Sequence, residues 1–181
     1  MNALAIDPIT QKVEPIEIEM KANTTYTFFS SILIDEFESI RDHVIYADAN
    51  ALSEAKEAYF IGEQLVLGKA LILGRADFDD RDVTITPEEL SSLIQYEVPL
   101  FYQKALALLR ESDLNLYRTF EVEKQGERLL LSSEWVLYTF NIADDRTRDY
   151  FLAELAKVIE AKESAAAFMQ KMAQLAINAA G

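Results

Sequence analysis

Apolar and polar residues come close to alternating near the start of the chain. Over residues 13–19, valine and isoleucine fall between glutamates, and a period of two is typical of a β-strand with one buried face. Residues 3–6 form a second short apolar run, and Asp7-Pro8 supplies a turn between the two segments. The pattern predicts an opening β-hairpin.

A three-to-four spacing of apolar residues replaces the alternation over residues 25–41. The apolar positions are Phe28, Phe29, Ile32, Leu33, Phe37 and Ile40. This spacing places them on one face of a helix, so the pattern predicts a single amphipathic helix. We expect a short strand at residues 43–46 after it, and one or two helical turns in the polar, alanine-rich residues 50–58.

A nearly continuous apolar run occupies residues 65–73, between Gly62 and Gly74. Its length and its glycine boundaries favour a buried strand, and Gly68 within the run permits a bend. The acidic residues 77–82 then connect this strand to the next element.

Thr86-Pro87-Glu88-Glu89 has the form of a capping box with proline at the first helical position. The motif predicts a helix from Pro87 to about Tyr96. Because proline cannot continue a helix without a kink, Pro99 predicts a bend before a second helix over residues 101–110.

The remaining residues combine a hairpin with helices. A short polar loop with one glycine separates two apolar runs and predicts a hairpin near residues 116–131. Ser132 or Ser133 offers a cap for a helix through Trp135. An interrupted apolar stripe predicts a long helix over residues 145–179.

The elements together predict an α+β fold. We expect a small antiparallel or mixed sheet with helices on one face, followed by a mainly helical C-terminal region that contains the hairpin. The expected division is an acidic α+β domain over residues 1–95 and a helical region over residues 96–181, unless the two form one continuous domain. Any boundary should lie near residues 96–99, where the charge also changes.

Composition narrows the class of protein. Half of the 181 residues are hydrophobic, so the chain can build a core, and no cysteine is present. Disulfides, thiolate metal sites and cysteine nucleophiles are therefore excluded. The opening residues lack a basic segment followed by a long apolar core, and no apolar run is long enough to span a bilayer. We expect a cytoplasmic location and no membrane partner.

The charge is strongly negative and uneven. The formal net charge is −14, and residues 1–95 hold 18 acidic and 7 basic residues, a net of −11. The electrostatic field of this negative charge repels phosphate groups, so direct binding of nucleic acid is disfavoured. A basic surface on another protein is the partner that this charge would attract.

One acidic cluster is a candidate metal site. The carboxylates of Asp77, Asp79, Asp80 and Asp82 offer oxygen ligands for a hard divalent cation. The segment lacks the glycine and the distal glutamate of an EF-hand loop. A charged, solvated turn between strands is the alternative interpretation, and it is the more common fate of such acidic runs.

Other catalytic patterns are absent from the sequence. His43 is the only histidine, no serine lies in a nucleophile elbow, and the spacing of Gly62, Gly68 and Gly74 does not form a phosphate-binding loop. A structural or exposed His43 is therefore expected, and no catalytic residue or cofactor is assigned. The aromatic residues that crowd the second half are expected to be mostly core, with some available as anchors for a protein partner.

Four segments of residues 1–94 carry a family resemblance. They are the opening Ala3-Leu-Ala-Ile-Asp-Pro8, Val44-Ile-Tyr-Ala-Asp48, Gly62-Glu-Gln-Leu-Val-Leu-Gly-Lys-Ala-Leu-Ile-Leu-Gly74, and the helix start after Val83-Thr-Ile-Thr. In these segments the chain resembles a small family of unknown function that is encoded by bacteriophages, plasmids and other mobile elements. The resemblance implies a mobile-element origin and assigns no activity.

Three functions follow as hypotheses. The first is a non-enzymatic interaction protein of phage or mobile-element type, whose acidic face binds a host nucleic-acid-binding or defence protein, in one version as a nucleic-acid mimic. The second is a structural or assembly accessory that associates through its long C-terminal helix, with a homo-oligomer as one form. The third is a divalent-metal enzyme or ligand-binding module that uses residues 77–82.

Overall fold

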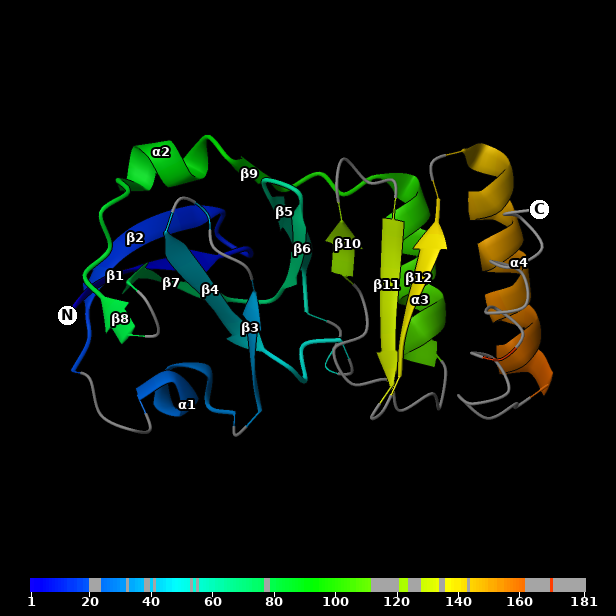
Figure 1. The fold of residues 1–181 in the computed structure, drawn as a ribbon, viewed down its shortest axis with the longest axis horizontal. Coiled ribbons are helices and arrows are strands. Elements are labelled where there is room, and N and C mark those ends of the chain that lie inside the picture. Colours follow the sequence, from blue (N-terminus) through cyan, green and yellow to red (C-terminus); the bar gives the residue numbers. More distant parts are fainter. Residues whose placement is uncertain are drawn as a thin grey trace. The chain divides into compact units, whose positions relative to one another are not determined.

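The structure is a computed structural model. It describes residues 1–19, 24–31, 33–37, 40, 42–52, 54, 56–76, 79–111, 121–123, 128–133, 136–142, 144–161 and 170. The fold is α+β, as the sequence predicts, and its sheets are antiparallel. The chain divides into two compact units, Met1–Glu97 and Val98–Gly181, and each is described by itself (Figure 1).

A six-stranded antiparallel sheet forms the centre of the first unit. Its order is β2-β1-β7-β4-β3, and β8 pairs with the end of β7. The strands are β1 (Asn2–Asp7), β2 (Lys12–Glu17), β3 (Ile34–Phe37), β4 (His43–Asp48), β7 (Ala70–Ala76) and β8 (Asp79–Arg81). The predicted opening hairpin is confirmed as β1 and β2, and the predicted strand at residues 43–46 is confirmed as β4.

Strand β7 joins the two halves of this sheet. Ala70 on β7 is in register with Ile6 on β1 and with Ala47 on β4. Because both neighbours run antiparallel to β7, they run parallel to each other, and both end at the same edge of the sheet. This edge brings together the side chains that follow Ile6 and Ala47.

A second, smaller sheet and a helix cover one face of the large sheet. They are β5 (Ala58–Ile61), β6 (Gln64–Leu67), β9 (Ile94–Gln95) and α2 (Pro87–Ser91). One apolar cluster contains residues from both sheets and from α2, and it includes Ile6, Ile45, Ile72, Tyr59 and Leu90. Burial of this cluster is the main favourable contribution to folding of the unit.

Helix α1 (Thr24–Phe29) covers the opposite face of the large sheet. Phe28 and Phe29 pack against a second apolar cluster that includes Val44, Leu71 and Leu73. Figure 1 shows α1 and α2 on opposite sides of the sheet.

The single helix expected over residues 25–41 is wrong. Helix α1 ends at Phe29, and Ser30 has a φ of 54°, a left-handed conformation that stops a right-handed helix. Residues 34–37 form β3 instead. Ile34 packs into the cluster beneath α1 and Phe37 into the opposite cluster, which a strand permits and one face of a helix does not.

The apolar run at residues 65–73 forms two strands, where one bent strand was expected. Gly68 has a φ of 71° and separates β6 in the small sheet from β7 in the large sheet. Left-handed backbone is readily adopted by glycine, so the chain passes between the two layers there. No regular helix lies in the described part of residues 50–58, which forms turns before β5.

The capping box is confirmed, but its helix is shorter than expected. Thr86 Oγ1 accepts a hydrogen bond from the Glu89 amide at 3.2 Å, and Glu89 Oε2 accepts one from the Thr86 amide at 2.9 Å. Helix α2 then stops at Ser91, and Ile94 pairs with Ile61 of β5. Strand pairing with the small sheet therefore overrides the helical pattern before Tyr96.

The described residues of the second unit form two helices and a three-stranded sheet. They are α3 (Leu100–Glu111), β10 (Glu121–Glu123), β11 (Arg128–Ser133), β12 (Val136–Asn141) and α4 (Asp145–Ala161). The predicted hairpin near residues 116–131 is confirmed as β10 and β11 where it is described, and residues 116–120 and 124–127 lie outside the described residues. The helix expected after Ser133 is wrong, because Ser133 pairs with Val136 and the chain continues as β12.

Helices α3 and α4 pack on each other. The rings of Phe101 and Phe151 meet edge to face at 6.1 Å, and Tyr102, Leu109 and Leu155 are buried. The second predicted helix is confirmed as α3. The helix predicted over residues 145–179 is described as α4 to Ala161, and the rest of that prediction, except Gln170, lies outside the described residues. In the part of the chain that is described, no helix combines the length and apolarity needed to cross a membrane.

Gly74 is expected to tolerate no side chain. A Cβ atom at Gly74 would lie 2.4 Å from the Asp82 carbonyl oxygen, a backbone atom of the segment that follows β8. We expect Gly74→Ala to lower the free energy of unfolding by about 2 kcal/mol, since overpacking forces backbone to shift. Gly62→Ala is the control: the space there is open but φ is 59°, so its cost should be about 1 kcal/mol from strain alone. Equal losses in chemical denaturation would contradict the prediction.

Candidate functional site

The acidic segment after β7 makes structural contacts. Asp80 accepts hydrogen bonds from the Tyr46 hydroxyl at 2.9 and 3.0 Å, and Asp82 Oδ1 accepts one from the Asn2 amide at 2.7 Å. Asp79 is exposed on β8, and Asp77 lies outside the described residues. Asp80 and Asp82 therefore contact other strands. Part of the acidic segment, which was expected to be a connecting loop, forms the strand β8.

An ion-pair network crosses four strands around Asp80. The Arg75 guanidinium on β7 pairs with Glu36 on β3 and with Asp80 on β8, the latter at 3.1 Å, and it donates to the Tyr46 hydroxyl on β4 at 2.7 Å. The Arg75 and Asp80 side chains are 25% and 16% exposed. Charge-assisted bonds that are partly shielded from water tie the outer strands to the centre of the sheet.

The described acids do not assemble into a metal centre. Among the described residues, no group of three or more histidine, aspartate and glutamate side chains could hold a metal ion. Neighbouring residues on a strand point to opposite faces, so β8 separates Asp79 from Asp80. Both carboxylate oxygens of Asp80 already accept hydrogen bonds from Tyr46.

His43 is buried, with 3% of its surface exposed. Its Nδ1 lies 2.8 Å from the Ile40 carbonyl oxygen, while the amides of Thr84 and Ile85 donate to Nε2 at 3.1 and 3.3 Å. Because a carbonyl only accepts and an amide only donates, Nδ1 carries the proton and Nε2 is the acceptor. His43 therefore connects β4 to the segment before α2, a structural role.

Two buried tyrosines have raised pKa values. Burial raises the pKa of Tyr59, and burial together with the Asp80 carboxylate raises that of Tyr46. The folded chain therefore holds these protons more tightly than the unfolded chain does. The stability that this contributes is fully present below the unfolded pKa of about 10 and is lost as pH rises above it.

We expect Tyr59→Phe to raise the midpoint pH of alkaline unfolding. The substitution removes one such group, and the Tyr59 hydroxyl is buried without a hydrogen-bond partner among the described residues. At pH 7 the variant should be as stable as the parent or more stable by up to about 1 kcal/mol, because an unsatisfied buried group is removed. Far-UV circular dichroism and tyrosinate absorbance across a pH titration measure both effects. An unchanged or lower alkaline midpoint would contradict the assignment.

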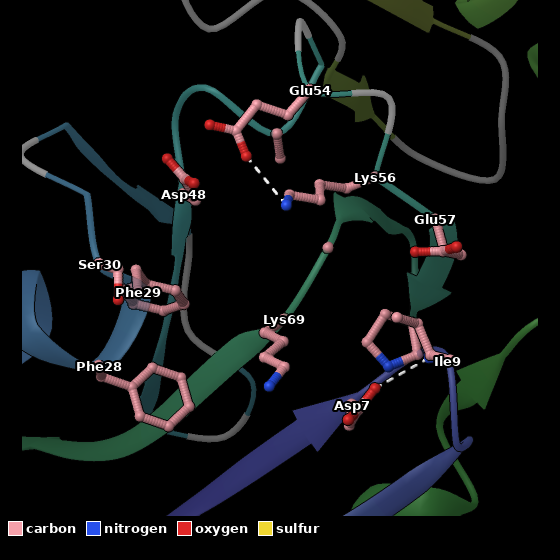
Figure 2. Close-up of a pocket in the computed structure, with 13 residues that line it drawn as sticks. Asp7, Ile9, Phe28, Phe29, Ser30, Asp48, Glu54, Lys56, Glu57 and Lys69 are labelled. Atoms are coloured by element: carbon pink, nitrogen blue, oxygen red, sulfur yellow. Dashed lines mark hydrogen bonds and ion pairs between the residues drawn. The ribbon is translucent and has the colours of Figure 1, made fainter.

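A pocket of about 350 Å³ opens in the first unit (Figure 2). Its lining comes from the turn after β1, from α1, from the end of β4 and the turns that follow, and from the chain before β7. The lining residues are Asp7, Pro8, Ile9, Phe28, Phe29, Ser30, Asp48, Ala51, Glu54, Lys56, Glu57, Gly68 and Lys69. It combines four carboxylates, two lysines and two aromatic rings.

The strand register explains how the charged residues meet. Lys69 directly precedes Ala70, while Asp7 and Asp48 directly follow its partners Ile6 and Ala47. Continuing the antiparallel register places Lys69 between the two aspartates, on the face of the sheet that α1 covers. Asp7 follows the strand predicted at residues 3–6, and Asp48 lies two residues beyond the strand predicted at residues 43–46. Only the pairing of both strands with β7 brings the two carboxylates together.

Some aromatic residues of the second half contribute to packing. Phe101 meets Tyr102 at 5.1 Å, and Arg148 lies over the Phe101 ring at 5.9 Å. In the first unit, Tyr96 packs against Tyr59 at 5.8 Å. Tyr150 is 44% exposed, and Trp135 lies outside the described residues.

The chain was compared with three kinds of known protein: protein-family models, curated proteins and solved structures. None of the three gives a match.

Proposed function

We propose that the chain is a non-enzymatic interaction protein whose first unit, Met1–Glu97, binds a basic surface of a partner protein. The observation that carries the proposal is a set of exposed carboxylates without basic partners. Glu14, Glu17, Glu57, Glu63, Asp79 and Glu88 are exposed and form no ion pair within the described residues. Among the described residues of the unit, no basic side chain neutralises these acidic groups.

The charge of the whole chain supports this partner class. The net charge of −14 attracts basic surfaces and accelerates their encounter, and it opposes direct contact with nucleic acid. Proteins that bind nucleic acid present basic surfaces of the required kind. Together with the resemblance to a mobile-element family, this makes a host nucleic-acid-binding or defence protein the proposed partner, whose nucleic-acid site the carboxylates would occupy.

Affinity capture with two charge-matched variants tests the proposal. One variant carries Glu14→Gln, Glu17→Gln and Glu88→Gln on β2 and α2, which pack together in the first unit. The control neutralises Glu111, Asp149 and Glu160, three exposed acids of the second unit. Both changes remove three negative charges, so only the position of the charge differs.

We expect the parent chain to capture a basic bacterial protein at low salt and to release it as salt rises, since salt screens exposed charges. Duplex DNA should release the same protein if its nucleic-acid site is occupied. The first-unit variant should lose most of the capture and the control little. Equal loss in both variants, or no partner at either salt, would contradict the proposal.

A further inference from the structure

We propose that the pocket beside Asp7 and Asp48 holds one basic side chain of the partner, an arginine or a lysine. The inference rests on the proposed function and assigns a contact site to it. Three features of the pocket carry it: the balance of charges, the fixation of two carboxylates, and the apolar surface beside them.

The charges of the pocket favour a cation. Lys56 pairs with Glu54 at 2.9 Å, and these two charges offset each other. Three carboxylates, those of Asp7, Asp48 and Glu57, remain against the single ammonium group of Lys69. An anionic ligand would approach Lys69 against three like charges, whereas a guanidinium or ammonium group would meet an excess of opposite charge.

Two of these carboxylates are held in place by the backbone. Asp7 Oδ1 accepts a hydrogen bond from the Ile9 amide at 3.0 Å, and Asp48 Oδ1 accepts one from the Asn50 amide at 2.9 Å. No donor among the described residues binds the second oxygen of either side chain. Groups that are fixed before binding lose little conformational entropy when a ligand arrives, which favours affinity.

Apolar side chains complete the pocket. Figure 2 shows Phe28 and Phe29 on one side and Asp7 with Ile9 on the other. Arginine and lysine carry apolar stems that pack on such surfaces, and a cation over an aromatic ring gains further attraction. Ile9 is 71% exposed, so the rim offers an apolar contact for a residue that flanks the basic side chain.

A capped peptide, Ala-Leu-Arg-Leu-Ala, is the probe, and the same peptide with neutral citrulline in place of arginine is its control. Titration into the full chain is followed by amide chemical shifts. We expect the arginine peptide to shift the amides of Ile9, Thr10, Asn50 and Lys69, and the citrulline peptide to bind at least about tenfold more weakly, since charge-assisted bonds are lost. Equal binding of the two peptides would overturn the inference.

Asp7→Asn with Asp48→Asn removes the charge and retains the oxygens that accept the backbone amides. We expect this pair to weaken the arginine peptide about tenfold, and Glu14→Gln with Glu17→Gln, which changes the net charge equally, to weaken it less than about twofold. An unchanged amide spectrum outside the pocket checks the fold. Equal effects of the two pairs would contradict the inference.

The variant Lys69→Met distinguishes a cation-binding pocket from an anion-binding pocket. Because Lys69 repels a cation, its removal should tighten binding of the arginine peptide by about threefold, with Lys104→Met in the second unit as the control. Weaker binding would indicate an anion site and overturn the inference. If the β2 and α2 variant loses the protein partner while the Asp7 and Asp48 pair retains it, the proposed function stands and the pocket assignment fails.

Discussion

His43→Ala should lower the free energy of unfolding of the first unit by about 4 kcal/mol, through lost hydrogen bonds and a cavity. The substitution leaves the amides of Thr84 and Ile85 without their acceptor, and the Ile40 carbonyl loses the Nδ1 donor but keeps its bond from the His43 amide. Because His43 is 3% exposed, water reaches these groups poorly. The loss is therefore larger than for a typical exposed polar side chain.

Hydrogen exchange measured by mass spectrometry reports on this unit separately from the other. Peptides that cover β4 and α2 should lose protection together, because His43 connects them. Thr84→Ala is the matched control, since it removes the hydroxyl that lies 3.1 Å from His43 Nε2, together with the γ-methyl group, and leaves the Thr84 amide in place. It should cost less than about 1 kcal/mol. A similar small loss for His43→Ala would show that the buried hydrogen bonds contribute little.

Arg75→Met should lower the free energy of unfolding by about 3 kcal/mol, the low end for breaking a buried ion pair. The variant leaves Glu36 and Asp80 without their cation, and Tyr46 loses a donor to its hydroxyl. The 25% exposure of the Arg75 side chain limits the effect, because solvent screens the charges that remain.

Lys56→Met is the control for Arg75→Met. It breaks the pair with Glu54, in which both side chains are about half exposed, at 46% and 51%. Exposed pairs contribute about 0–1 kcal/mol, so urea unfolding should show little change. Comparable losses in the two variants would mean that the Arg75 network behaves as an ordinary surface pair. Adding Asp80→Asn to Arg75→Met should restore part of the stability, since an unpaired charge is then removed.

Local patterns in the sequence predicted the elements that depend on neighbouring residues. The hairpin of β1 and β2, the capping box at Thr86 and helix α3 each arise from contacts within a short stretch of chain. Turn residues, capping side chains and helical spacing specify such elements without reference to the rest of the fold. They are confirmed for this reason.

Elements whose form depends on pairing with another strand were missed. Residues 34–37 have a spacing that also suits a helix, and they form β3 because β4 provides its hydrogen bonds. Residues 94–95 leave the helical pattern to pair with β5. In both places pairing with another strand, the adjacent β4 or the more distant β5, overrides the local preference, and periodicity alone carries no information about it.

The candidate site shows the same limit. The sequence suggested a candidate metal site at residues 77–82 because four aspartates lie close together along the chain there. Asp80 accepts hydrogen bonds from Arg75 and Tyr46 on other strands. Asp7, Asp48 and Lys69 are far apart in sequence, and their juxtaposition follows only from the register of β1 and β4 on β7.

The central place of β7 also has a consequence for the order in which the chain folds. The hairpins β1–β2 and β3–β4 close over short stretches, but both bind β7, whose residues begin at Ala70. During synthesis, neither half of the sheet can complete its pairing until β7 has left the ribosome. Pairing over such sequence separations raises contact order and slows folding. Until then, the hairpins β1–β2 and β3–β4 expose unpaired strand edges. The nascent chain is therefore most prone to aggregation just before β7 emerges.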